Sequence, residues 1–176
     1  MAIDHVKSAA ITLLDGPPAA AVTAGEGSPG YLKEVGGYNT AVAASSANAT
    51  YQWVRVPSNC KLKAIWFFSA AQGGGTVDIG LYYATDGLGN QPTALLAANA
   101  INQNIFAAAS AVTAAQAGTQ VLGGTASFTM DKRNMPLWQA AGLTSDPGGS
   151  FDIVGTVVAP ITTGTGLWGV SVYFCE

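Results

Sequence analysis

Residues 76–85 read TVDIGLYYAT, and this stretch decides the fold class. Its odd positions from 77 to 83 hold Val, Ile, Leu and Tyr, whereas its even positions from 78 to 82 hold Asp, Gly and Tyr. Successive side chains of a β-strand point to opposite faces. The alternation therefore predicts a strand with one face in the core and the other toward solvent. The glycines at 73–75 predict the turn from which the strand starts.

Two further strands are predicted just before this stretch. Residues 50–56 (TYQWVRV) alternate, with Tyr51, Trp53 and Arg55 on one face, and turn residues follow at 57–59. Residues 60–70 (CKLKAIWFFSA) begin with alternation, in which Lys61 and Lys63 mark a solvated face. They continue with four large apolar residues, which predict a strand covered on both faces and a place for a subunit contact.

The last two predicted strands are residues 150–159 (SFDIVGTVVA) and 167–175 (LWGVSVYFC). The order Gly-Gly, hydroxyl, apolar, Asp, Ile occurs twice, at 74–79 and at 148–153. This echo indicates equivalent strands in two sheets, unless it is a coincidence. Strands that recur between Gly-rich turns predict an antiparallel sandwich or barrel.

The remaining segments are less regular. Residues 1–46 are broken by Gly and Pro and are predicted to form an extended arm, in which residues 9–14 and 38–42 are candidate edge strands. The Ala-rich residues 94–117 have good helix propensity and predict one or two short helices. A short strand is expected at 125–130. A short helix is expected after it, with Asn134 as its cap, Pro136 in its first turn and Gly142 near its end.

Composition excludes several classes of protein. The 176 residues are 49% hydrophobic and only 10% charged, with a net charge of −3, whereas disordered chains combine low hydrophobicity with high charge. The 7 basic residues are dispersed, and nucleic-acid binding needs a basic patch. No stretch is apolar enough to span a membrane, and residues 1–14 do not resemble a secretion signal. So little charge predicts a surface hidden against other copies or a large partner.

Residues with catalytic or metal-binding chemistry are few. His5 is the single histidine, so no multi-histidine metal site can form. Cys60 and Cys175 lack a metal-binding spacing and are interpreted as inert thiols, although a disulfide between them is left open. Asp86, Asn90 and Asp146 lack the alternating pattern of a calcium loop. We therefore predict no catalytic, cofactor-binding or metal-binding residue, and no enzymatic activity.

Asp78 and Asp152 each interrupt an apolar strand. A carboxylate pair is the machinery of glycosidases. The favoured interpretation is structural: alternation places each Asp on the solvent face, or each binds backbone amides of its Gly-Gly turn. Most aromatic residues lie in strand segments and are predicted to pack in the core, whereas exposed ones would stack on sugars or anchor interfaces.

Six segments together resemble small structural proteins of tailed bacteriophages, over nearly the whole chain. They are VKSAAIT…TAGEGSPGYLKEV (6–35), VRVPSNCKLKAIWF (54–67), TVDIGLYYATDG (76–87), MDKRNMPLWQAAGL (130–143), DPGGSFDIVGTVV (146–158) and GLWGVSVYF (166–174). The resemblance carries no short site motif, so no functional residue transfers from it. It implies an all-β, antiparallel, jelly-roll-like β-sandwich, divided into an extended N-terminal arm (1–46) and a β-sandwich domain (47–176), with one or two short helices.

The resemblance also implies a function. The expected role is a capsid decoration or cement protein, made in the host bacterial cytoplasm, which binds the outside of the capsid and bridges major capsid protein subunits as a homotrimer. Deletion of residues 1–45 should then abolish capsid binding and leave the β core folded. Two alternatives remain open: a tail, baseplate or head-fibre subunit, and a carbohydrate-binding β-sandwich module that uses exposed Trp and Tyr.

Overall fold

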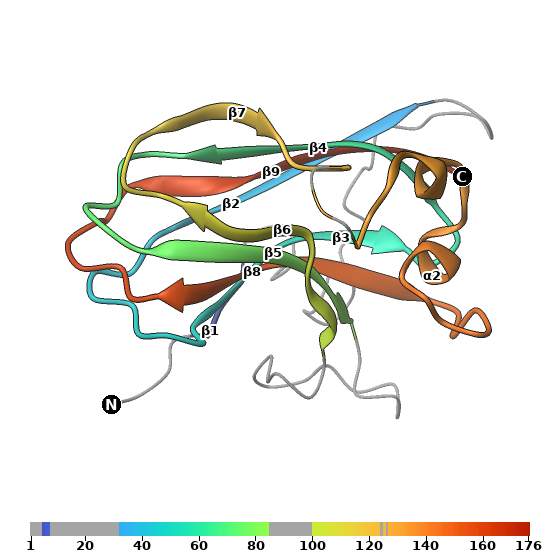
Figure 1. The fold of residues 1–176 in the computed structure, drawn as a ribbon, viewed down its shortest axis with the longest axis horizontal. Helices are drawn as coiled ribbons and strands as arrows, with labels where there is room; N and C mark the ends of the chain where they lie inside the picture. The colour runs from blue at the N-terminus through green and yellow to red at the C-terminus, as the bar shows by residue number, and fades with distance from the viewer. Residues whose placement is uncertain (1–4, 8–31, 85–99, 124, 126) are drawn as a thin grey trace, which may run out of the picture.

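The chain folds as a two-layer β-sandwich, seen in a computed structural model that describes residues 5–7, 32–84, 100–123, 125 and 127–176 (Figure 1). A five-stranded sheet has the order β1-β3-β8-β5-β6, and a four-stranded sheet has the order β2-β9-β4-β7. The strands are β1 (His5–Lys7), β2 (Lys33–Thr40), β3 (Thr50–Pro57), β4 (Lys61–Ser69), β5 (Thr76–Tyr83), β6 (Ala100–Ala111), β7 (Gln116–Gln120), β8 (Ser150–Ala159) and β9 (Leu167–Cys175).

The strand order is that of a jelly roll. From β2 to β9, eight antiparallel strands are divided into two sheets of four, and each sheet alternates strands from the two ends of the chain. Two Greek keys wound together give this arrangement. The short β1 is added to it as a parallel neighbour of β3. The expectation of an all-β, jelly-roll-like sandwich is confirmed.

Five strands were predictable at nearly their observed limits. The stretches 50–56, 60–70, 76–85, 150–159 and 167–175 became β3, β4, β5, β8 and β9. The echoed segments, however, do not lie in two different sheets. They open β5 and β8, which are paired antiparallel neighbours in the same sheet, with Asp78 opposite Thr156 and Tyr82 opposite Asp152.

The prediction of helix in the Ala-rich region is wrong. The described part of that region forms β6 and the first two residues of β7, while residues 94–99 lie outside the described residues. Helix propensity is a weak prior, and pairing with a neighbouring strand overrides it. Here β6 pairs with β5, and β7 completes the four-stranded sheet beside β4.

The segment between β7 and β8 also departs from prediction. Residues 125–130 do not form a strand, since only an isolated bridge joins Thr125 and Phe128. A 3-10 helix, η2 (Met130–Asn134), and a one-turn α-helix, α2 (Leu137–Ala140), follow. The predicted short helix therefore exists, but Pro136 stands at its N-cap position instead of Asn134. The amide of Leu137 donates to the carbonyl of Cys60, which ties α2 to the start of β4.

The second half of the predicted arm includes a strand of the sandwich. Residues 33–40 form β2, which pairs along its whole length with β9 at the edge of the four-stranded sheet. Asn39 donates from Nδ2 to the carbonyl of Gln52 on β3, and so links the two sheets. Residues 8–31, including the candidate strand at 9–14, lie outside the described residues. No helix in the described part of the chain is long and apolar enough to cross a membrane.

The core between the sheets is built around aromatic rings. Trp53 packs against Trp168 and Phe67, each with ring centroids 5.8 Å apart, and Tyr51 meets Trp168 edge-on at 4.5 Å. A Cβ on Gly155 would lie 2.3 Å from the Trp53 ring, so only glycine fits there. The prediction that most aromatic residues are core residues is confirmed for this group.

A β-bulge in β3 changes which side chains share a face. The register with β8 shifts between Gln52 and Val54, so one extra residue is inserted at Trp53. Strict alternation had placed Arg55 with Tyr51 and Trp53. The bulge instead turns Gln52 and Arg55 to the same outer face of the sheet, where both reach Asp152.

Candidate functional site

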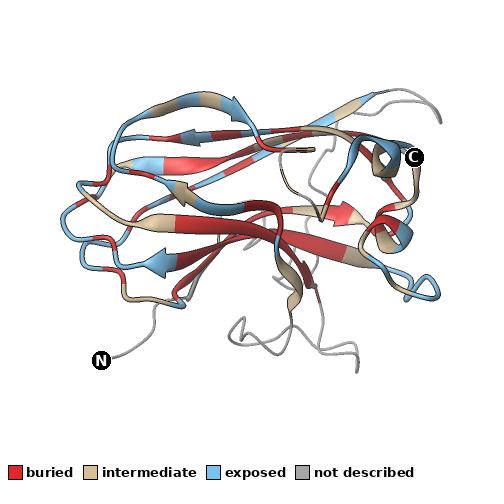
Figure 2. Cartoon of the chain, viewed as in Figure 1, coloured by how far each residue is buried: buried red, intermediate tan, exposed pale blue. Residues whose placement is uncertain are grey.

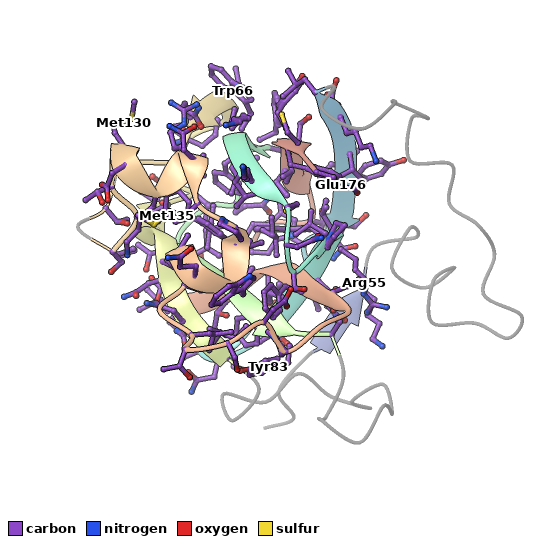
Figure 3. All side chains as sticks on the ribbon, turned by 90° about the vertical axis from the view of Figure 1, so that its right-hand side faces the viewer. Arg55, Trp66, Tyr83, Met130, Met135 and Glu176 are labelled. Atoms are coloured by element: carbon purple, nitrogen blue, oxygen red, sulfur yellow. The ribbon has the colours of Figure 1, made fainter. Side chains whose placement is uncertain are left out.

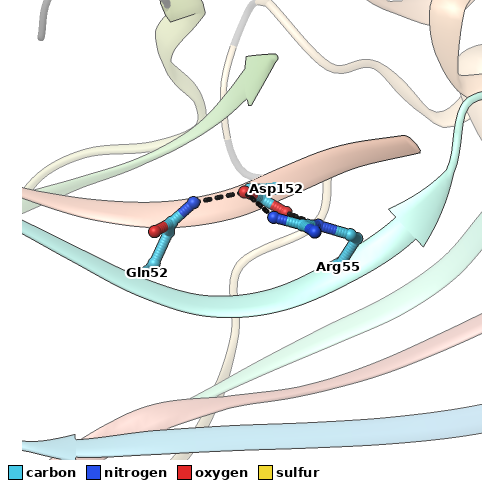
Figure 4. Close-up of polar contacts among 3 residues, drawn as sticks. All are labelled: Gln52, Arg55 and Asp152. Carbon is cyan, nitrogen blue, oxygen red and sulfur yellow. Dashed lines mark hydrogen bonds and ion pairs between the residues drawn. The ribbon is translucent and has the colours of Figure 1, made fainter. Parts of the chain in front are cut away.

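The outer face of the five-stranded sheet carries a buried ion pair (Figure 4). Arg55 on β3 donates from Nε to Asp152 Oδ1 at 2.7 Å and from Nη2 to Oδ2 at 3.0 Å, and Gln52 Nε2 donates to the same carboxylate. The Asp152 side chain is fully buried, and that of Arg55 is 10% exposed. A buried carboxylate needs a charged partner and further hydrogen bonds to offset its lost hydration. Asp152 therefore holds β8 to β3.

Asp78 supports the irregular strand β6. Its Oδ1 accepts the backbone N–H of Ala109 at 2.7 Å, and its Oδ2 accepts Gln103 Nε2 at 3.1 Å. The β5–β6 register shifts at several places, and Ala109 has a φ of 48°. Bulged residues leave ladder groups unpaired, and Asp78 accepts one of them. Asp78 is thus a structural acceptor for an edge strand.

The prediction that the two carboxylates lie on the solvent face is wrong. Asp78 is 7% exposed and Asp152 is fully buried, and the hydrogen bonds described above do not go to the Gly-Gly turns. Asp78 lies opposite Thr156, which is four residues from Asp152 along β8, or about 13 Å. Inverting glycosidases hold their carboxyl groups about 6.5–9.5 Å apart. The separation does not match that reaction.

Tyr82 completes this face. Its hydroxyl lies 2.7 Å from Thr156 Oγ1 on the neighbouring strand, and burial raises its pKa above the usual value. Tyr82 and Val154 are fully buried and pack together with Ala100. Figure 2 shows the result as continuous burial along β5 and β8. The predicted half-buried strand is therefore buried on both faces.

The two thiols lie near the C-terminal end of β9. Cys60 is buried, and burial raises its pKa to about 12, so it stays a protonated thiol at neutral pH. Cys175 is half-buried and lies opposite Lys61 in the sheet. Both cysteines are free. This arrangement agrees with the interpretation of Cys60 as an unreactive core residue.

The other candidates from the sequence are dispersed. Asp146 accepts from Ser58 Oγ and from the amide of Gly148, which makes it a turn residue. Asp86, Asn90 and the side chain of His5 lie outside the described part. Among the described residues, no three His, Cys, Asp or Glu side chains gather as metal ligands would. Lys61 is exposed, as predicted, whereas Lys63 binds Asn134 and the carbonyl of Arg133.

The most distinctive surface is the outer face of the four-stranded sheet. Tyr38 is 67% exposed, Leu167 55%, Phe68 44% and Trp66 39%. We call these four residues the aromatic face. Register places them together: Tyr38 and Phe68 flank Gly169 on the central strand β9, Trp66 lies opposite Ser171, and Leu167 lies opposite Thr40. Figure 3 shows Trp66 projecting outward from β4, away from the space between the sheets.

The edge strand β7 helps to hold this surface. Gly118 has a φ of 100° and lies at a register shift between β4 and β7. A Cβ there would come within 2.9 Å of the Phe68 ring. The absence of a side chain at Gly118 therefore allows the Phe68 ring to pack against the backbone of β7. The ring is positioned by the backbone although its other side is exposed.

Several polar side chains beside the aromatic face bind one another. Ser171 Oγ donates to Glu34 Oε1 at 2.6 Å. This bond, together with one from Tyr173, lowers the pKa of the exposed Glu34 carboxyl, and the bond to Glu34 raises the pKa of Tyr173. Lys33 pairs with Glu176 at 2.8 Å at the same end of the sheet. The charges thus gather where β2 begins and β9 ends, away from Tyr38, Phe68 and Leu167.

The prediction that β4 is covered on both faces is wrong for the described residues. Ile65 and Phe67 point into the core, but Trp66 and Phe68 point outward and are partly exposed. The apolar run indicated that β4 has two apolar faces. It did not indicate whether this chain or another molecule covers the outer one.

Comparison with solved structures shows which proteins have a similar fold. No protein-family model matches the chain, and no curated protein matches it. A solved chain from the "Capsid of Ralstonia phage GP4" is similar over 98% of this chain and 97% of its own length, with a TM-score of 0.61 and 14% identity. A chain from the "Cyanophage Pam1 capsid asymmetric unit" gives a TM-score of 0.46 and 13% identity, over 91% of this chain and 99% of its own. At 14% identity, the first similarity establishes a shared fold.

Proposed function

We propose that this protein is a structural component of a phage virion, which binds the outside of the capsid and stabilises it by bridging major capsid protein subunits. The observation that carries the proposal is the fold similarity to a chain from the capsid of Ralstonia phage GP4, which extends over nearly the full length of both chains. A similarity confined to part of the sandwich would show only that both chains contain β-sheets. Here the similarity covers 98% of this chain and 97% of the other.

The described residues suit a structural role. Asp78 and Asp152 are both engaged in holding strands, and the Cys60 thiol is protonated in the core. Catalysis needs a nucleophile or base within reach of a substrate. Asp78, Asp152 and Cys60 serve the fold, and the exposed apolar side chains are available for contact with another molecule.

The mechanism is thermodynamic linkage. A protein that binds the assembled shell and not its separated subunits stabilises the shell by an amount that grows with occupancy and affinity. A rigid sandwich is suited to this role, because strands hold its contact residues in place and little side-chain entropy is lost on binding. The proposed location is the exterior of the capsid, and the proposed partner is the major capsid protein.

The experiment is addition of the purified protein to particles that lack it. We expect saturable binding in many copies per particle, density on the outer surface by electron microscopy, and a higher temperature of shell disruption. Binding in a few copies at one vertex would instead assign the protein to a tail, baseplate or head fibre. No binding to any particle component would overturn the proposal.

The N-terminal arm is proposed to contribute to capsid binding. A deletion that ends at residue 45 would strip β2 from the sheet and remove the buried Ala41 and Ser45. The informative deletion therefore covers residues 1–31, which keeps β2 and removes only the three-residue β1 among the described strands. We expect it to weaken capsid binding strongly and to leave the melting transition of the sandwich close to that of the full chain. Unchanged binding would remove the arm from the mechanism.

A carbohydrate-binding module is the second candidate, because Trp66, Phe68 and Tyr38 are exposed on one sheet face. Sugar sites combine such rings with polar groups that are free to bind the ligand. Here Ser171 and Glu34 already bind each other. A change of tryptophan fluorescence on titration with glycans would favour this candidate over the capsid role.

A further inference from the structure

We draw no further inference here: the strongest candidate, the aromatic face on the outer side of the four-stranded sheet, carries none because nothing in the structure shows which molecule covers it.

Discussion

The outer faces of the two sheets have the same alternating backbone but different surroundings. On the five-stranded sheet, Asp152, Val154 and Tyr82 are fully buried. On the four-stranded sheet, the equivalent outward positions hold Trp66 and Phe68, which are about two-fifths exposed. The Asp152 carboxylate is thus covered while the Trp66 and Phe68 rings are partly open, which reverses the usual order of a soluble protein.

The difference between the two faces predicts how each responds to substitution. Burial of a polar group on the first face costs free energy unless it is hydrogen-bonded, and the Arg55–Asp152 pair and the Asp78–Ala109 bond supply such partners. The aromatic side chains on the second face can be removed without leaving a buried group unpaired. Substitutions on the first face should therefore change folding more than those on the second.

The largest expected effect is that of Asp152→Asn. The substitution removes the Arg55–Asp152 ion pair from a buried site, and removal of one member of a buried pair costs about 3–5 kcal/mol. Chemical denaturation measures the free energy of unfolding. The double variant Asp152→Asn/Arg55→Gln should be less destabilised, because the buried cation is removed together with the carboxylate. A loss below about 1 kcal/mol in the single variant would show that the pair does not hold β3 to β8.

The second effect compares one glycine from each outer face. A Cβ on Gly80 of β5 would lie 2.1 Å from the carbonyl oxygen of Gln103, whereas one on Gly36 of β2 would have a single contact at 3.8 Å. Gly80→Ala should therefore cost about 1–3 kcal/mol through overpacking. Gly36→Ala should be neutral or stabilising by up to about 1 kcal/mol. Equal costs in thermal unfolding would contradict the contrast between a covered and an open face.

The smallest expected effect concerns Glu34. Hydrogen bonds from Ser171 and Tyr173 lower its pKa, so the folded protein favours the carboxylate. This contribution to stability is present above the unfolded pKa of about 4.3 and is lost as the pH falls through the folded value. Glu34→Gln should thus lower the urea midpoint slightly at pH 7 and leave it equal to that of the wild type near pH 3. A difference that grows toward acid pH would have the wrong sign.

Prediction from sequence succeeded where local pattern and tertiary structure depend on the same physics. β5 and β8 follow from alternation between glycine turns, because a strand in a sandwich must separate its two faces. It failed for β6, because the Ala-rich sequence of this strand favours a helix, whereas hydrogen bonding to β5 in the fold favours a strand. It also failed for Arg55, because a bulge at Trp53 inserts one residue and reverses the face of each residue after it.

The candidate site shows the same limit. The run from Ile65 to Phe68 indicated two apolar faces and predicted a place for a subunit contact, and the structure exposes Trp66 and Phe68 of this run. The chain by itself determined which residues alternate, where the turns fall and that charge is scarce, since these are local properties of the sequence. Only the tertiary structure decided which outer face is covered, because burial depends on segments that are distant in sequence and meet only in the fold.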